Sequence, residues 1–180
     1  MKFYIVDVFA TERFSGNQVA IVERNKNISA KEMQKIAQEM NFTETIFFSP
    51  EKDKRGRYNA RIFTPEKEVE FSGHAIVGCA YVLINYYAKR HNLKYVHFQL
   101  IHESVKIEIE HGKEDDIGGD VFWIEEQEPV FGHEFEKILF SRILSIEPEK
   151  IDDQFPIVEV DTGLPMIIVP IKNLESQKYI

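Results

Sequence analysis

Residues 73–87 constrain the fold more than any other segment, because they form a predicted helix with apolar side chains on every side. The segment begins at Gly73 and carries the apolar series Ala75, Ile76, Val77, Cys79, Ala80, Val82, Leu83 and Ile84. A helix without a polar face is buried rather than laid on a surface. Strand patterns precede and follow it, so we expect an α+β fold in which a twisted, barrel-like sheet surrounds one central buried helix.

The rest of the first half consists of predicted strands and one further helix. Strand patterns occupy residues 3–9, 19–22, 42–49, 57–64, 94–100, 105–110 and 120–126. Ser29 and Glu32 form a capping box, which predicts the start of a helix. Apolar residues at helical spacing continue it, and Asn41 is suited to a left-handed stop. Small residues at Gly78 and Ala80 would let the strands approach the central helix closely.

Pro129 marks a predicted boundary between an N-terminal lobe, residues 1–128, and a second segment, residues 129–180. The second segment carries a predicted helix at about 134–144 and strand patterns at 157–160 and 166–171. With about fifty residues it lies at the lower limit for an independent core. We therefore expect it to be the start of an incomplete second lobe.

Composition and charge exclude several classes of function. The formal net charge of −8 argues against a nucleic-acid partner, which would need a basic face. The longest mostly apolar run, residues 75–88, is too short to span a bilayer, so no membrane partner is expected and a cytoplasmic location is the default. A single cysteine, Cys79, excludes an internal disulfide and a multi-cysteine metal site, and the histidines lack metal-ligand spacing. Trp123 is expected in the core.

Two residues capable of proton transfer stand inside apolar runs. Glu44 lies between two threonines in the segment Asn41-Phe-Thr-Glu-Thr-Ile-Phe-Phe48, and His74 follows a glycine in Phe71-Ser-Gly-His-Ala-Ile-Val-Gly78. Carboxylates and imidazoles in apolar surroundings are typical of acid/base sites. Strand alternation alone leaves another interpretation open, in which Glu44 faces water and the flanking threonines Thr43 and Thr45 point inward. By pattern alone, His74 would more often be a helix-start residue whose side chain bonds to the backbone.

These segments together resemble the PhzF family, the phenazine-biosynthesis-like proteins of the diaminopimelate epimerase fold. The resemblance rests on five motifs in order: the opening that ends in Phe14-Ser-Gly-Asn17, the stretch from Met33 to Glu44, Arg61-Ile-Phe-Thr-Pro65, Phe71-Ser-Gly-His-Ala75 and Thr162-Gly-Leu-Pro165. Each motif alone is weakly specific, whereas five in the same order are fairly specific.

The resemblance implies two similar lobes with an active site in the cleft between them. It implies isomerisation or epimerisation of a small carboxylate-bearing metabolite, without a metal or an organic cofactor. Glu44 matches the family's acid/base glutamate, and His74 matches the histidine of its Gly-His-Ala motif. Asn17, Ser72 and Gly73 fall at positions that the resemblance assigns to substrate binding; by pattern alone, Asn17 would be a turn former.

Two departures from the family pattern shape these expectations. Position 76 is Ile where the family usually has Thr, and the family's second half, which supplies a facing aspartate, would lie beyond Ile180. The sequence thus resembles a truncated or split member, with three hypotheses open: an isomerase, half of an enzyme completed by a separate chain, or an inactive remnant lobe that binds a small anion or a protein partner. We expect a homo-oligomer, such as a dimer, or a complex with a chain that supplies the missing half.

Overall fold

The computed structural model describes residues 1–10, 12, 14–25, 27–88, 93–112, 120–125, 128–162 and 165–177. The chain divides into two compact units, Met1–Glu125 and Glu126–Ile180.

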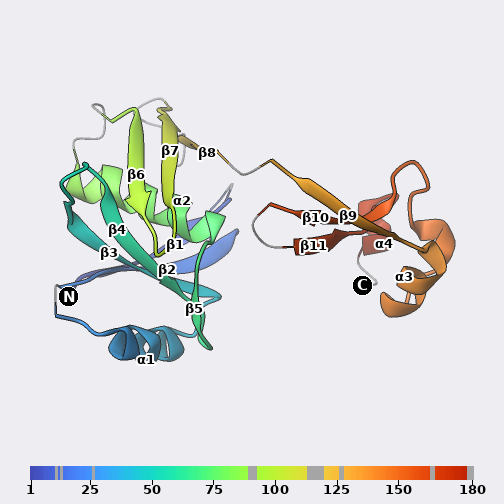
Figure 1. The fold of residues 1–180 in the computed structure, drawn as a ribbon, viewed down its shortest axis with the longest axis horizontal. Coiled ribbons are helices and arrows are strands. Elements are labelled where there is room, and N and C mark those ends of the chain that lie inside the picture. Colours follow the sequence, from blue (N-terminus) through green and yellow to red (C-terminus); the bar gives the residue numbers. More distant parts are fainter. Residues whose placement is uncertain are drawn as a thin grey trace. The chain divides into compact units, whose positions relative to one another are not determined.

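The first unit contains one eight-stranded mixed sheet (Figure 1). Its strands are β1 (Phe3–Val8), β2 (Asn17–Glu23), β3 (Glu44–Lys52), β4 (Tyr58–Phe63), β5 (Glu68–Val69), β6 (Tyr95–Gln99), β7 (Ser104–Glu110) and β8 (Val121–Ile124). The order is β1-β2-β3-β4-β6-β7-β8, with β5 paired to β4. The pairs β2–β3 and β4–β6 are parallel and the others are antiparallel.

The sheet is open rather than closed into a barrel, which corrects part of the expected fold. Within the described residues β1 and β8 pair with one strand each and not with each other. The parallel pairing between β4 and β6 is also short, with only two paired residues on each strand. An apolar helix requires walls around it, but it does not specify hydrogen bonds between the first and last strands. The pattern that predicted the buried helix therefore could not predict closure.

The central helix is buried, as its all-round apolar pattern predicts. It consists of α2 (Gly73–Val82), followed without a break by one π-helical turn, η1 (Leu83–Tyr87). Its side chains join those of β1–β4 and β6–β7 in the largest apolar cluster of the unit. Gly78 lies close against the sheet, because a Cβ at this position would lie 2.8 Å from Cγ1 of Val19. The absence of a side chain at residue 78 thus sets the spacing between α2 and β2.

A second helix, α1 (Ala30–Met40), covers the opposite face of β2, β3 and β4. Ser29 accepts a hydrogen bond from the Glu32 amide, and the Glu32 carboxylate accepts one from the Ser29 amide, so the predicted capping box is confirmed. Asn41 ends the helix with φ of 53°, the left-handed stop that was expected. Because helices cover both faces, β2 and β3 are buried nearly throughout their central residues.

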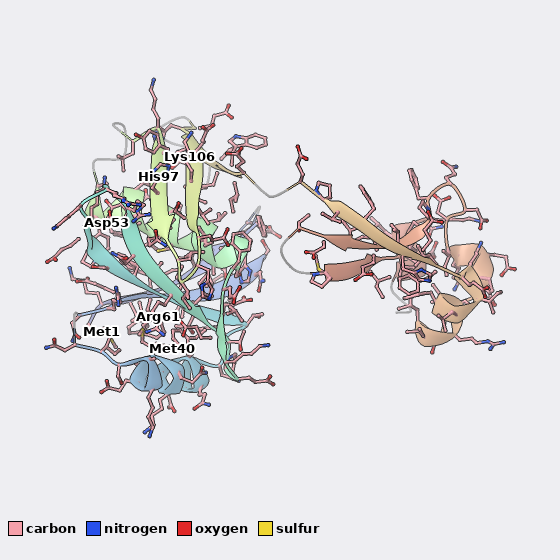
Figure 2. All side chains as sticks on the ribbon, in the orientation of Figure 1. Met1, Met40, Asp53, Arg61, His97 and Lys106 are labelled. Carbon is pink, nitrogen blue, oxygen red and sulfur yellow. The ribbon has the colours of Figure 1, made fainter. Side chains whose placement is uncertain are left out.

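Two polar contacts join different elements of the first unit. Arg61, labelled in Figure 2, lies on β4, and its guanidinium binds the Glu68 carboxylate of β5 through two hydrogen bonds of 2.6 Å each. The Tyr87 hydroxyl at the end of the central helix donates to the Glu23 carboxylate at 2.6 Å. Burial and the Glu23 carboxylate together raise the pKa of Tyr87. Trp123 on β8 is 59% exposed, so its predicted core position is wrong.

The second unit contains a three-stranded antiparallel sheet in the order β11-β10-β9. Its elements are β9 (Val130–Phe135), α3 (Lys137–Ile143), a 3-10 turn η3 (Pro148–Lys150), β10 (Ile157–Asp161), β11 (Pro165–Ile168) and α4 (Leu174–Gln177). The predicted helix at 134–144 begins only at Lys137, because residues 134 and 135 pair with β10. The motif Thr162-Gly-Leu-Pro165 includes residues 163 and 164, which lie outside the described residues.

Apolar side chains remain exposed on two strands of this second sheet. They are Val130, Phe131, Met166, Ile167 and Ile168. The small buried cluster of the unit lies instead around Phe140, Ile146, Ile151 and Ile157. Within the described part of the chain, no helix is long and apolar enough to cross a membrane.

Candidate functional site

The two predicted acid/base residues lie in contact, although they are thirty positions apart in the sequence. Oε2 of Glu44, the first residue of β3, is 2.6 Å from Nε2 of His74, the second residue of α2. The Glu44 and His74 side chains are only 15% and 13% exposed. The structure therefore places a carboxylate and an imidazole together in a mostly buried position at the start of the central helix.

The alternation of β3 explains why Glu44 faces the helix. Ile46 and Phe48 belong to the apolar cluster around α2, whereas Phe47 belongs to the cluster beneath α1. Because successive side chains in a strand point to opposite faces, Glu44 shares the α2 face with Ile46 and Phe48. The alternative interpretation, in which Glu44 faces water, would require one face of β3 to be exposed to solvent. Both faces of β3 are covered here, and Thr45 is buried on the α1 side.

The contact between Glu44 and His74 is close but poorly aligned. Neither Oε2 of Glu44 nor Nε2 of His74 forms a hydrogen bond of normal geometry with any described group, although both atoms are buried. At 2.6 Å the two atoms must therefore meet off the direction of the N–H bond. Catalytic hydrogen bonds are often misaligned without substrate and align when it binds. The short separation, more than the present angle, makes this pair suited to passing a proton.

The other nitrogen of His74 lies beside Ser72. Ser72 Oγ is 3.2 Å from Nδ1 of His74, so the imidazole is contacted at both of its nitrogens. Ser72 is the N-cap residue of α2, but its side chain makes no capping hydrogen bond. The first hydrogen bond of the helix runs from the Ile76 amide to the Ser72 carbonyl. The amides of residues 73–75 precede that bond and lack helical acceptors, as at any helix start.

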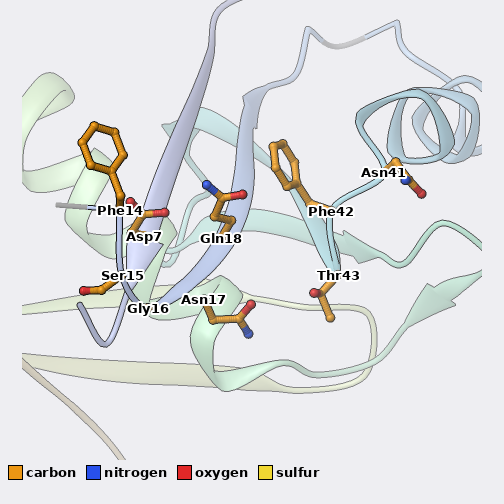
Figure 3. Close-up of a pocket in the computed structure, with 9 residues that line it drawn as sticks. All are labelled: Asp7, Phe14, Ser15, Gly16, Asn17, Gln18, Asn41, Phe42 and Thr43. Atoms are coloured by element: carbon orange, nitrogen blue, oxygen red, sulfur yellow. The ribbon is translucent and has the colours of Figure 1, made fainter. Parts of the chain in front are cut away.

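The residues around Asn17 line a separate hollow of about 390 Å³ (Figure 3). Its lining comprises Asp7, Phe14, Ser15, Gly16, Asn17, Gln18, Asn41, Phe42 and Thr43. Figure 3 shows Gln18 and Phe42 directed to one side of the strands and Asn17 and Thr43 to the other. The structure thus gathers Glu44, His74, Ser72 and Gly73 at the start of α2. It places Asn17 where the parallel strands β2 and β3 begin.

Gly16 is needed for the turn that enters this hollow. Its φ is +85°, a conformation that favours glycine, and a Cβ there would lie 2.5 Å from the Val8 carbonyl oxygen. Asp7, Gln18 and Thr43 were not predicted as lining residues. The signal that could have identified them is the parallel pairing of β2 with β3, which aligns Val19 with Glu44 and brings the preceding residues together.

Other chemically capable groups lie away from the Glu44–His74 contact. Cys79 is fully buried inside α2, and burial raises the pKa of its thiol well above the usual value. Among the described residues, no cluster of three or more His, Cys, Asp or Glu side chains is arranged to hold a metal ion. Ile76, where the resembled family usually has Thr, is fully buried in the core.

Comparison with solved structures identifies a similar fold. A Bacillus anthracis phenazine biosynthesis protein of the PhzF family superposes with a TM-score of 0.82 and 27% sequence identity. The superposition covers 99% of this chain and 59% of that chain. A PhzF family protein from Enterococcus faecalis gives a TM-score of 0.69, also at 27% identity, and covers 97% of this chain. The mixed α+β fold is therefore that of PhzF structures.

Sequence comparison gives relatives whose names denote isomerases. An uncharacterized isomerase from Clostridium acetobutylicum is 31% identical over 178 residues, which cover 97% of this chain and 57% of the relative. A trans-2,3-dihydro-3-hydroxyanthranilate isomerase from Pseudomonas aeruginosa is 39% identical over 83 residues, 46% of this chain and 29% of that protein. This chain spans less than two thirds of the length of these relatives.

The family model described as phenazine biosynthesis-like protein matches residues 6–180, nearly the whole chain. This match agrees with the five motifs and with the superposed structures. The chain belongs to the PhzC/PhzF family of phenazine biosynthesis-like proteins.

Proposed function

We propose that this chain carries the acid/base residues of an isomerase that moves a proton on the carbon skeleton of a small carboxylate-bearing metabolite. The observation that carries the proposal is the buried 2.6 Å contact between Glu44 and His74 at the start of the central helix. In this scheme the Glu44 carboxylate removes a proton from one carbon of the substrate. The protonated Glu44 then donates a proton to another carbon, so the reaction needs no redox partner and no cofactor.

The surroundings of the pair suit an anionic substrate. The start of α2 presents amide N–H groups and the positive end of the helix dipole, which together favour a carboxylate. His74 stands between Glu44 and Ser72 and can share the mobile proton with Glu44 or orient the substrate. Asn17, in the neighbouring hollow, is proposed to hold a polar group of the substrate through its amide. Ser72 and Gly73 were predicted as substrate-binding residues, and the first amides of α2 support that role for Gly73.

The test compares two glutamate variants in an isomerase assay. Trans-2,3-dihydro-3-hydroxyanthranilate, which the Pseudomonas relative is named for, is the first compound to try. Glu44→Gln removes the acid/base group and should lower the rate by about 10²–10⁴-fold, the usual contribution of such a group. Glu66→Gln, an exposed carboxylate in the turn between β4 and β5, is the matched control and should keep the wild-type rate. An unchanged rate in Glu44→Gln would refute the assignment of Glu44.

A second wall for the site is also proposed. The relatives contain further chain beyond the part that aligns here, since the alignments cover 57% and 59% of their lengths. We propose that residues 1–128 form one lobe and that further polypeptide completes the other, either in the same chain or as a separate subunit. A closed cleft would exclude water from the Glu44–His74 pair, which a single lobe does less well. We also propose a cytoplasmic location.

A partner-binding function is the second candidate, and the exposed apolar strands β9 and β11 favour it. Phe131 is 68% exposed, and Met166, Ile167 and Ile168 are each about half exposed. Apolar side chains exposed together on one small sheet are typical of an interaction site. If the lobe only binds a small anion at the start of α2, the affinity for that anion should survive Glu44→Gln and weaken in His74→Ala. Under the isomerase proposal, Glu44→Gln instead lowers turnover by about 10²–10⁴-fold.

A further inference from the structure

Two serines occupy the N-cap positions of the two long helices, but only one of them caps. Ser29 Oγ accepts a hydrogen bond from the Glu32 amide at the start of α1. Ser72 holds the same position at the start of α2, yet its hydroxyl makes no capping hydrogen bond. It lies 3.2 Å from Nδ1 of His74 instead. A serine at an N-cap normally satisfies a first-turn amide, so the different use of Ser72 requires its own explanation.

The chemistry of the opposite nitrogen shows what Ser72 does. An ionised Glu44 carboxylate is only an acceptor, so of the two neutral tautomers of His74 only the one with its proton on Nε2 can donate to Oε2, 2.6 Å away. Nδ1 then bears a lone pair and needs a donor. The Ser72 hydroxyl is the described group within hydrogen-bond distance of Nδ1, and a hydroxyl can rotate to donate. The partner at one ring nitrogen thus fixes which nitrogen carries the proton.

We propose that Ser72 is a positioning residue, whose hydroxyl donates to Nδ1 of His74 and thereby keeps the imidazole proton on Nε2, facing Glu44. The Glu44–His74 contact is poorly aligned, so it does not fix the orientation of the ring by itself. The Ser72 contact supplies the second point of attachment. The proposal replaces the expected substrate-binding role of Ser72 and rests on the proposed function only for its effect on turnover.

The direct test is the tautomer of His74, read from ¹⁵N shifts of the imidazole nitrogens in the full chain at alkaline pH. His74→Gln identifies the signals of His74 among the six histidines. In the wild type, the Nε2–H form should dominate. Ser72→Ala should shift the population toward Nδ1–H, and Ser72→Thr, which keeps a hydroxyl, should restore the wild-type shifts. Ser72→Gly is the second hydroxyl-free variant, because glycine is well accepted at an N-cap.

Ser29→Ala is the matched control, since it removes a serine from the other N-cap. It should lower the melting temperature and leave the His74 shifts unchanged, whereas Ser72→Ala should change the shifts with a smaller loss of melting temperature. A wild-type Nδ1–H tautomer, or identical His74 shifts in wild type, Ser72→Ala and Ser72→Gly, would overturn the proposal. Either result leaves the Glu44 assignment standing, because that assignment is tested by Glu44→Gln.

Kinetics give an independent readout once a substrate is identified. A positioning role predicts that Ser72→Ala lowers kcat with little change in KM, and that Ser72→Thr restores kcat. A substrate-binding role predicts a raised KM with kcat retained, and that result would contradict the inference.

Discussion

Replacing Gly78 with alanine tests how closely the central helix approaches the sheet. A Cβ at residue 78 would lie 2.8 Å from Cγ1 of Val19, 3.1 Å from Cγ2 of Val8 and 3.4 Å from Cδ1 of Ile21. Carbon atoms pack best at about 3.5–4.0 Å, so Val19 must move by roughly 1 Å or the helix must shift. The new methyl group therefore overpacks the face between α2 and β2.

The expected loss of stability combines two opposing effects. Overpacking a dense core costs about 1–3 kcal/mol. Replacing glycine with alanine within a helix contributes about 1 kcal/mol in the opposite direction. We therefore expect Gly78→Ala to lower the free energy of unfolding by about 1 kcal/mol. Urea denaturation followed by fluorescence of Trp123, the only tryptophan, measures this for the unit that contains α2.

A double-mutant cycle separates the clash from other effects. Val19→Ala removes the atom nearest to the new methyl group and should itself cost about 2–3 kcal/mol, because Val19 is fully buried. The combined variant should be more stable than the sum predicts by about 1 kcal/mol, since the new methyl group fills the space that Val19 leaves. If Gly78→Ala stabilises the protein, or if the two effects add, the close approach of α2 to β2 is refuted.

Four further changes test other parts of the account. Ser29→Ala should lower the free energy of unfolding by about 1 kcal/mol in urea denaturation, because it removes a confirmed N-cap; equal stability would contradict that. Tyr87→Phe should reduce the loss of stability at alkaline pH. The pKa of Tyr87 is raised in the folded protein, so the contribution of Tyr87 to the free energy of unfolding is full below the unfolded pKa of about 10 and is lost as the pH rises above it. Identical curves of stability against alkaline pH for wild type and Tyr87→Phe would count against this. Cys79 should react with a thiol reagent only at the rate of unfolding, since its thiol is buried; rapid labelling of the folded protein would argue otherwise. The exposed apolar strands β9 and β11 should drive self-association in sedimentation experiments, and a clean monomer at high concentration would speak against it.

Local signals predicted the helices of the first unit well. The boundaries of α1 follow from Ser29, Glu32 and Asn41, whose effects act within one helical turn. Burial of α2 follows from its all-round apolar composition, which holds whatever surrounds it. These features depend on neighbouring residues only, so the sequence alone was sufficient.

Features that depend on pairing between distant segments were predicted less well. The residues at 134–135 were assigned to a helix but pair with β10, because tertiary contacts override local preference. Trp123 fits a strand pattern, but the pattern does not reveal whether its face is covered. The candidate site follows the same rule: Glu44 and His74 were identified by residue type and family resemblance. Their contact depends on how β3 is placed against α2 in the folded unit, which no local pattern encodes.

Isomerisation in deuterated water by wild type and Glu44→Gln, with the product analysed by mass spectrometry, shows directly whether the Glu44–His74 pair transfers the proton. We expect the wild type to convert the substrate and to place deuterium from the solvent at the carbon that receives the proton, because the proton on Glu44 exchanges with water. We expect Glu44→Gln to lose both conversion and deuterium incorporation. Conversion and incorporation in Glu44→Gln at the wild-type rate would show that the Glu44–His74 pair does not transfer the proton.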